Sequence, residues 1–240
     1  MWLMVATVCA FFVKGLCGFA NTLVFTTILG FTKDNINISP IELVLGYPSN
    51  VIVAWKERKS IQWKICIPLS ILVIAGSLPG ILLLKNVDAR LIKIIFGVVV
   101  IVIGVEMLFR EFAKKKRKES KILLSAIGVL SGVLCGLYGI GALLAAYVSR
   151  VTDNSNSFKA NLCIVFLFEN TFRIVAYSIF GVITMETVKD AFVLLPLMLI
   201  GLFLGMKSAK VLDEKSVKKI VVVALIVSGV ALVVNNAYLV

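Results

Sequence analysis

Histidine is absent from this chain of 240 residues, and acidic residues are scarce, with 13 Asp and Glu against 25 Lys and Arg. Without histidine the chain has no His-ligated zinc site, no Ser-His-Asp triad and no histidine proton relay. The five cysteines form no CxxC pair, and the sequence contains no glycine-rich loop of the Walker type. We therefore expect no enzyme activity, no metal, no cofactor and no ATP hydrolysis by this chain.

Charge of either sign is also sparse, because charged residues make up 16% of the chain and hydrophobic residues 60%. The mean hydropathy is +1.03. A soluble domain has about 45–50% apolar and about 25% charged residues. Three uncharged runs, 65–84, 122–149 and 220–240, each reach the roughly 20 residues that cross a bilayer as a helix. The composition predicts an all-α integral membrane protein.

The net charge of +12 comes from basic residues that cluster between the apolar runs. The densest cluster is the run from Lys114 to Lys118, which by composition also resembles a nucleic-acid patch. Its place between two hydrophobic segments favours a cytoplasmic loop, because short cytoplasmic loops collect Lys and Arg. We expect lipid and a small anion as partners, and no nucleic acid. An N-terminus without a basic residue before Lys14 does not fit a cleaved signal peptide.

The chain repeats its own pattern once. Gly15-Leu16-Cys17-Gly18 matches Gly136-Leu137-Tyr138-Gly139 after 121 residues, and Asn50 matches Asn170 after 120. Near the end of each half the spacing becomes 125, where Lys85, Asp88 and Gly104 meet identical residues. A repeat of this kind predicts two related units. We interpret the chain as a first membrane repeat over 1–113, a basic linker over 114–120 and a second membrane repeat over 121–240.

Each half begins with an apolar stretch broken by glycine, over 1–31 and 122–149. Three further segments follow, at about 40–55, 65–84 and 91–109, and at about 159–182, 189–206 and 217–238.

The distribution of Lys and Arg predicts the topology of the two glycine-broken stretches. If both cross the membrane, the loop charges divide 12 against 11; if both are hairpins that enter and leave on one side, they divide 18 against 5. The hairpin interpretation gives six crossings, two re-entrant hairpins and an inverted second half, a common design of secondary transporters. It also places the linker 110–121 in the cytoplasm. The alternative is two kinked helices that cross fully.

Re-entrant backbone at membrane depth has to line a cavity or be buried in protein. The half-helices that leave the two glycine turns would present free N–H groups and positive dipole ends, which together favour an anion. Asn21 and Thr22 follow the first turn and add side-chain donors. The alternative is close helix packing through small residues. The glycines concerned are Gly15, Gly18, Gly136, Gly139 and Gly141.

Two cations fall inside apolar segments, where charge is costly and often functional. Arg173 lies three residues after Asn170, on the same face of a helix, and a guanidinium suits an oxyanion. Lys14 precedes the first glycine turn. We expect Lys14, Asn50, Asn170 and Arg173 to contribute to substrate binding.

For each cation the residues leave an alternative. Glu169 could instead form a structural ion pair with Arg173, and Lys14 could extend to the membrane interface. Glu169 and Glu42 are also the candidates for proton coupling.

The chain resembles the sulfite exporter family (TauE/SafE) of membrane transporters. The resemblance rests on Lys14-Gly-Leu-Cys-Gly-Phe-Ala-Asn-Thr-Leu23, on Ser131-Gly-Val-Leu-Cys-Gly-Leu-Tyr-Gly-Ile-Gly141 and on Asn170-Thr-Phe-Arg-Ile-Val-Ala-Tyr177 followed by Gly181. It implies transport of sulfite or organosulfonates without ATP, and it points to the glycine turns and Arg173. The first turn departs from the family, since Ala20-Asn21-Thr22 replaces a glycine-rich stretch followed by proline.

Together these observations predict a secondary transporter of a small oxyanion in the plasma (inner) membrane. An anion channel of the same architecture and a membrane partner protein that transports nothing are the alternatives.

Overall fold

In the computed structural model, the chain is described over residues 2–29, 35–86, 121–139, 141–152 and 154–211, and at scattered positions within 94–109 and 219–237. The described residues form helices joined by turns and contain no strand. The elements in chain order are α1 (Trp2–Cys17), α2 (Asn21–Leu29), α3 (Asn35–Lys56), the short 3-10 helix η1 (Arg58–Ser60), α4 (Trp63–Asn86), α6 (Lys121–Tyr138), α7 (Ala142–Val151), α8 (Ser155–Ile179) and α9 (Met185–Ser208). The predicted all-α class is confirmed.

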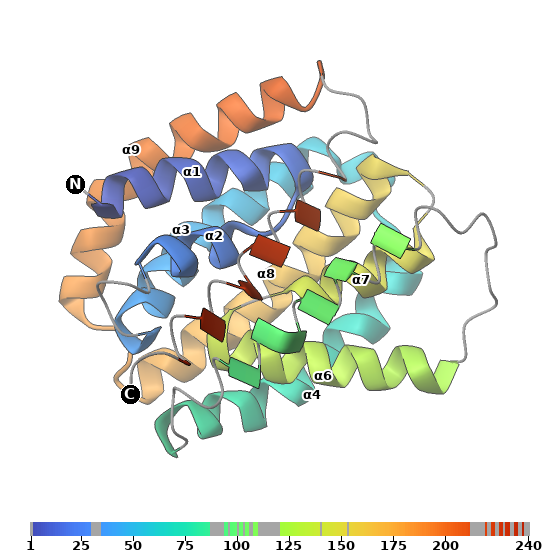
Figure 1. Ribbon diagram of the computed structural model, residues 1–240, viewed down its shortest axis with the longest axis horizontal. Helices are drawn as coiled ribbons and strands as arrows, with labels where there is room; N and C mark the ends of the chain where they lie inside the picture. The colour runs from blue at the N-terminus through green and yellow to red at the C-terminus, as the bar shows by residue number, and fades with distance from the viewer. Residues whose placement is uncertain are drawn as a thin grey trace.

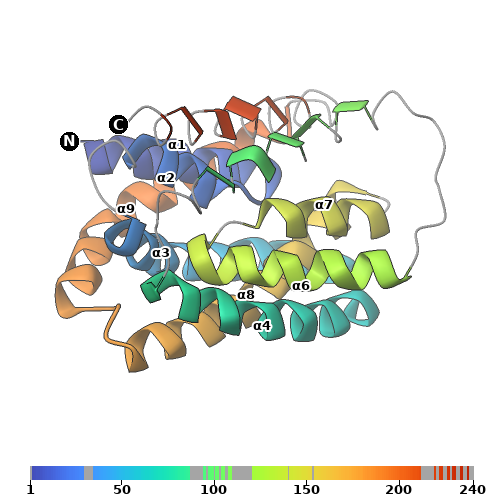
Figure 2. The same cartoon turned by 60° about the horizontal axis from the view of Figure 1, so that its bottom comes forward.

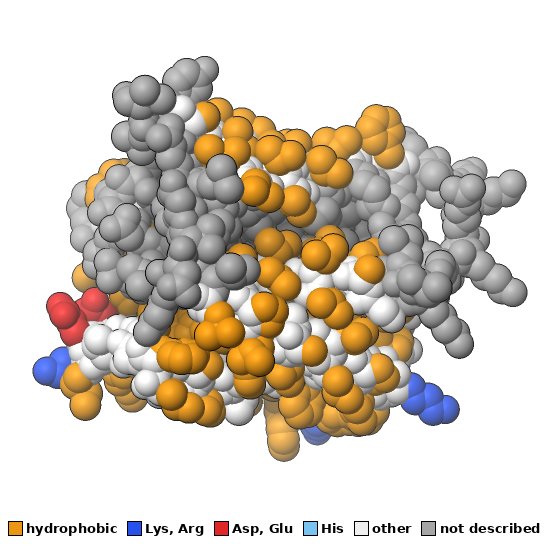
Figure 3. All heavy atoms as spheres, turned by 90° about the horizontal axis from the view of Figure 1, so that it is seen from below, with side chains coloured by type: hydrophobic (Ala, Val, Ile, Leu, Met, Phe, Trp, Pro, Cys, Tyr) orange, Lys and Arg blue, Asp and Glu red, His pale blue; other side chains and the backbone are white. Residues whose placement is uncertain are grey.

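Three of the described helices are long and apolar enough to cross a membrane: Trp63–Leu82 in α4, Ser155–Ile179 in α8 and Met185–Ser208 in α9. α3 has a similar length, but Glu42 and Asn50 lower its hydropathy. The predicted crossings at 91–109 and 217–238 fall largely outside the described residues. Hydrophobic side chains cover the described part of the face in Figure 3, with charged side chains at its rim, as expected for a surface that contacts lipid.

Local sequence sets where the last two of these helices begin. Asn154 caps α8, because its side-chain oxygen accepts a hydrogen bond from the N–H of Ser157 at 2.8 Å. Thr184 and Thr187 form a reciprocal capping box at the start of α9. Such caps satisfy N–H groups that have no partner within the helix. They fix the ends of α8 and α9 and therefore the positions of the side chains along them.

The helices pack in pairs that recur between the two halves of the chain. α1 lies along α9, and α6 lies along α4 (Figures 1 and 2). α3 and α8 pack on each other, and each also packs against outer helices, mainly α9 for α3 and α4 for α8. The two short helices α2 and α7 follow α1 and α6 and contact them. α3 and α8 therefore form the centre of the bundle, between the two outer pairs.

Glycines allow close contact in both outer pairs. A Cβ on Gly205 of α9 would lie 3.0 Å from the Cα of Gly15, and a Cβ on Gly80 of α4 would lie 3.2 Å from the Cα of Gly136. One turn earlier, Gly201 lies against Val8 of α1 and Gly76 against Val129 of α6. Corresponding residues of the two pairs are separated by the spacings found in the sequence. The spacing is 121 residues from Gly15 of α1 to Gly136 of α6, and 125 residues from Gly80 of α4 to Gly205 of α9. Both contacts bring backbone against backbone, which only glycine permits.

These contacts predict that Gly205→Ala destabilises the protein. The added methyl group would meet the backbone of Phe12 and Gly15, so that α1 and α9 have to separate. Overpacking of this kind costs about 1–3 kcal/mol, and each kcal/mol lowers the Tm by about 2–4 °C in a chain of this size. Thermal unfolding in detergent measures the change. Leu204→Ala is the control, because Leu204 is exposed on the other side of the same helix turn. Equal melting temperatures for the two variants would contradict the packing described above.

Candidate functional site

The chain turns at glycine in the middle of both apolar stretches. α1 ends at Cys17, and Gly18 and Ala20 have positive φ values of 88° and 70° before α2 begins at Asn21. α6 ends at Tyr138, and Gly139 has a φ of 70° before α7 begins at Ala142. In each turn the glycine N–H donates to a carbonyl four residues back, at 2.7 Å, and so closes the preceding helix. The two turns therefore begin in the same way, but they differ two residues later, where Ala20 has a positive φ and Gly141 has a φ of −98°.

α3 and α8 supply the polar side chains near these turns. Glu42, Gly46 and Asn50 recur every four residues on one face of α3, and Phe166 and Asn170 do the same on α8. The faces lie close together, since a Cβ on Gly46 would be 3.2 Å from Oε1 of Glu42 and 3.9 Å from Nδ2 of Asn170. Gly46 leaves room between the carboxylate and the amide.

A pocket lies between the two turns and these two helix faces. The empty space among its lining atoms is about 340 Å³, part of it open to solvent. The lining combines both glycine-containing turns with one face each of α3 and α8, and it is mostly polar. The lining residues are Lys14, Ala20, Asn21, Thr22, Leu23, Glu42, Asn50, Gly139, Gly141, Phe166 and Asn170.

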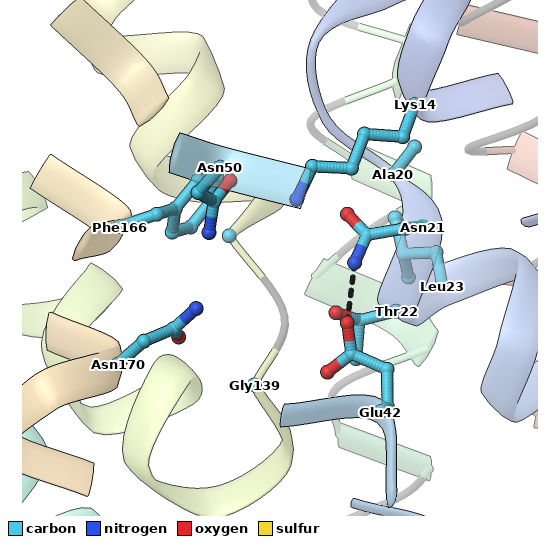
Figure 4. Close-up of a pocket in the computed structure, with 11 residues that line it drawn as sticks. Lys14, Ala20, Asn21, Thr22, Leu23, Glu42, Asn50, Gly139, Phe166 and Asn170 are labelled. Atoms are coloured by element: carbon cyan, nitrogen blue, oxygen red, sulfur yellow. Dashed lines mark hydrogen bonds between the residues drawn. The ribbon is translucent and has the colours of Figure 1, made fainter. Parts of the chain in front are cut away.

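Lys14 points its ammonium group into this pocket (Figure 4). The residue is 1% exposed, and Nζ lies 6.0 Å from the centroid of the Phe166 ring. Within the described part of the chain, Nζ has no hydrogen bond and no ion pair. The amide groups of Asn50 and Asn170 point toward the same space in Figure 4. A buried ammonium with two amides beside it is an arrangement that favours an anion as ligand.

Glu42 forms the opposite wall of the pocket. One carboxylate oxygen, Oε1, accepts a hydrogen bond from Nδ2 of Asn21, at the start of α2 (Figure 4). The other, Oε2, lies 3.8 Å from a terminal nitrogen of Arg173. Glu42 is 2% exposed, so its charge depends on these partners rather than on water. The carboxylate therefore connects the pocket to the cation behind it.

Arg173 lies behind the pocket rather than among the residues that line it. Its guanidinium donates to the carbonyl of Cys135 at 2.6 Å, lies 3.9 Å from the carboxylate of Glu169, and stacks on Tyr177 at 5.6 Å. Nε is buried and has no hydrogen-bond partner among the described residues. The guanidinium also lies against Gly139, where a Cβ would clash with it. Arg173 is thus held by two carboxylates and by the second glycine turn.

Glu169 completes the charged group from the far side of Arg173. Its carboxylate accepts from the hydroxyl of Ser77 on α4 at 3.5 Å, and the residue is 1% exposed. The ion pair with Arg173 is the alternative that the sequence left open. Contact of Arg173 with substrate stays a prediction.

Eight of the predicted site residues line one pocket and five do not. Gly15 and Gly136 pack against α9 and α4, and Gly18 packs against the side chain of Lys159. Arg173 and Glu169 lie behind the pocket. Sequence reasoning did not identify Ala20, Leu23 and Phe166 as pocket residues, although Phe166 is one helical turn before Asn170. The eight that line the pocket are Lys14, Asn21, Thr22, Glu42, Asn50, Gly139, Gly141 and Asn170.

Comparison with known families gives one match. The model of the family described as sulfite exporter TauE/SafE matches residues 3–232, nearly the whole chain. No curated protein and no solved structure matches the chain significantly.

The geometry around Gly46 predicts that Gly46→Ala impairs ligand binding while the protein still folds. The methyl group would lie 3.2 Å from the carboxylate of Glu42, which has to shift, and 3.7 Å from Nδ2 of Asn21, and its three nearest neighbours are side-chain atoms rather than backbone. One methyl group in a closely fitting site changes affinity by about 10–200-fold. Titration of the purified protein with sulfite, followed by thermal shift, measures the affinity. Val51→Ala, on the exposed side of α3, is the control. Unchanged affinity in Gly46→Ala would place the ligand elsewhere.

Proposed function

The chain belongs to the sulfite exporter TauE/SafE family of membrane transporters, and we propose that it is a secondary transporter of a small sulfur-containing anion in the plasma membrane. The substrate is of the sulfite or organosulfonate class, and its movement requires no ATP hydrolysis. Family membership supports transport of a sulfur-containing anion across a membrane. The pocket between the two glycine turns supports the position of the substrate site.

The ammonium group of Lys14 is the observation that carries this proposal. It is buried, faces the pocket and has no counter-ion among the described residues. An isolated buried ammonium is unfavourable by several kcal/mol, so an anion that enters the pocket gains from neutralising it. Arg173 is not equivalent, because Glu42 and Glu169 already lie within 4 Å of it. We therefore infer that Lys14 contacts the substrate directly and that Arg173 acts through Glu42 and Gly139.

Neutral donors would complete the site. Asn50 and Asn170 direct their amides into the pocket, and each can donate two hydrogen bonds from Nδ2. Gly141 precedes α7 and provides no side-chain cap, so the first N–H groups of α7 remain available. α2 begins in the same way beside the pocket, with Asn21 and Thr22 in its first turn. Such donors bind a tetrahedral or pyramidal oxyanion without adding net charge.

We propose that residues 1–113 and 121–240 are inverted repeats, each a re-entrant glycine-broken pair of half-helices followed by three crossings. The recurring glycine contacts of α1 with α9 and of α6 with α4 support this arrangement. Gly104 packs against Ile226, and Gly229 packs against Ile101. These two contacts are related by the repeat, since the two glycines are 125 residues apart and so are the two isoleucines. The charge distribution of the loops supports a cytoplasmic location for 110–121. Binding at the interface of two such repeats permits alternating access.

Glu42 is the better candidate for proton coupling of the two carboxylates that the sequence suggested. It lines the pocket, whereas Glu169 contacts Ser77 and Arg173 behind it. The charges of the four buried ionisable side chains sum to zero when all are ionised; these are Lys14, Arg173, Glu42 and Glu169. An anion with one charge that enters the pocket therefore leaves one negative charge in excess. Protonation of Glu42 removes that excess.

Replacing Lys14 by Met is expected to abolish saturable sulfite flux, while Lys14→Arg retains part of it. Methionine has a similar length without the charge, so the pocket keeps its shape. Uptake of labelled sulfite into proteoliposomes preloaded with unlabelled sulfite measures this flux. Saturable exchange indicates a carrier, whereas a channel conducts without saturable exchange. Lys189→Met, at an exposed position near the start of α9, is the matched control. Full exchange by Lys14→Met would refute the proposed site.

Arg173→Ala is expected to abolish flux and to lower stability, because two buried carboxylates lose their cation. Removing one partner of a buried ion pair costs about 3–5 kcal/mol. Melting temperature and flux are measured on Arg173→Ala and on the double variant Arg173→Ala with Glu42→Gln. If Arg173 acts by neutralising Glu42, the double variant recovers part of the stability. A double variant as unstable as Arg173→Ala would contradict that role.

A further inference from the structure

The connection between α3 and α4 combines exposed tryptophans with basic side chains. The chain has three tryptophans, and two of them flank this connection. Trp55 lies in the last turn of α3 and is 69% exposed, and Trp63 is the first residue of α4 and is 51% exposed. Large aromatic side chains are normally buried in proteins. Two exposed indoles at one connection therefore indicate a particular environment.

Exposed apolar residues lead up to both indoles along their helices. Val51 precedes Trp55 by one turn of α3 and is exposed. Ile67 and Ile71 follow Trp63 at intervals of one turn on α4, and Ile71 is 63% exposed. In a helix that crosses a membrane such a stripe contacts the acyl chains. The two tryptophans therefore stand where the hydrocarbon region ends, the level at which indoles are enriched.

Basic side chains lie directly beyond the two indoles. Arg58 stacks on the ring of Trp55, with Cζ 5.1 Å from its centroid, and donates to the Trp55 carbonyl at 3.1 Å. Only Glu57 opposes them in the segment from Trp55 to Lys64. The exposed basic residues of the segment are Lys56, Arg58, Lys59 and Lys64.

α8 holds this connection in place. The N–H of Gln62 donates to the side-chain oxygen of Asn161 at 2.7 Å, and Nδ2 of Asn161 donates back to Gln62 at 3.1 Å. Asn161 is completely buried and Gln62 is exposed, so the pair ties the exposed connection to the interior of the bundle. Within the connection, the N–H of Ser60 donates to the carbonyl of Glu57 at 2.9 Å. The basic side chains are therefore presented by a fixed turn, which reduces the entropy lost when they bind a ligand.

We propose that this segment, Trp55 to Lys64, binds the phosphate headgroup of an anionic phospholipid. Arg58, Lys59 and Lys64 supply the charge and the donors, and the two indoles set the depth. A lipid fits better than a soluble anion, because the indoles and the apolar stripes place these cations at the headgroup layer. Attraction of basic side chains to anionic lipid is strong enough to measure for each residue. The proposal is independent of what the pocket transports.

The test compares the full-length wild type with a variant carrying Arg58→Gln, Lys59→Gln and Lys64→Gln. Both proteins are purified and mixed with phosphatidylglycerol or phosphatidylcholine, and bound lipid is counted by native mass spectrometry. Each Lys or Arg near the surface contributes about a factor of five in affinity, so the triple variant is expected to lose phosphatidylglycerol binding at least tenfold. Phosphatidylcholine binding is expected to stay unchanged.

The control variant removes the same charge elsewhere, with Lys189→Gln, Lys207→Gln and Lys210→Gln at exposed positions. It is expected to keep wild-type binding of phosphatidylglycerol. Inorganic phosphate at millimolar concentration is added in a parallel arm and is expected not to displace the lipid. Three results would each overturn the proposal. They are equal loss of phosphatidylglycerol in both triple variants, wild-type binding of phosphatidylglycerol by the variant with Arg58→Gln, Lys59→Gln and Lys64→Gln, and displacement of the lipid by inorganic phosphate.

A second readout uses the intrinsic fluorescence of the tryptophans. In a Trp2→Phe background only Trp55 and Trp63 remain. Brominated phosphatidylglycerol, diluted to a small fraction of an otherwise neutral bilayer, is expected to quench them at least twice as strongly as brominated phosphatidylcholine at the same fraction. The Arg58, Lys59 and Lys64 substitutions are expected to remove the difference. Equal quenching by both lipids in the wild-type segment would show that the indoles lie at the interface without a bound anionic headgroup, against the proposal.

Discussion

The interaction on which the centre of this protein depends is the placement of Glu42 between the buried cation Arg173 and the side-chain amide of Asn21. A carboxylate removed from water is unfavourable unless positive charge and hydrogen-bond donors surround it. Arg173 supplies the charge from one side, and Asn21 supplies a donor from the other. Because Arg173 is already shared between Glu42 and Glu169, Lys14 remains the cation without a partner in the described structure. The proposed binding of an anion in the pocket rests on this unequal distribution.

Much of the site could be predicted because its physical signals are local in the sequence. A positive φ favours glycine, so Gly18 and Gly139 indicated the turns in the sequence, and Gly139 lines the pocket. Polar residues in apolar helices are costly, so Lys14, Asn50 and Asn170 could be identified from sequence alone. The helical class followed from the length of the uncharged runs.

The remainder depended on contacts between distant segments. A cation in an apolar helix gives the same sequence pattern whether it faces a ligand or a carboxylate. The position of Arg173 behind the pocket therefore could not be predicted from the sequence and is seen only in the structure. Gly15 and Gly136 likewise belong to the turn motifs but pack against neighbouring helices. Phe166 carries no polar signal, and its place beside Lys14 follows only from how α8 meets α1.

Three contacts in series connect the two glycine turns across the middle of the molecule. Asn21 at the first turn bonds Glu42, Glu42 faces Arg173, and Arg173 bonds the carbonyl of Cys135, at the end of the helix that leads into the second turn. Glu42 and Arg173 therefore form a continuous polar connection between the two halves of the chain. A displacement of the Glu42 carboxylate would change contacts at both turns.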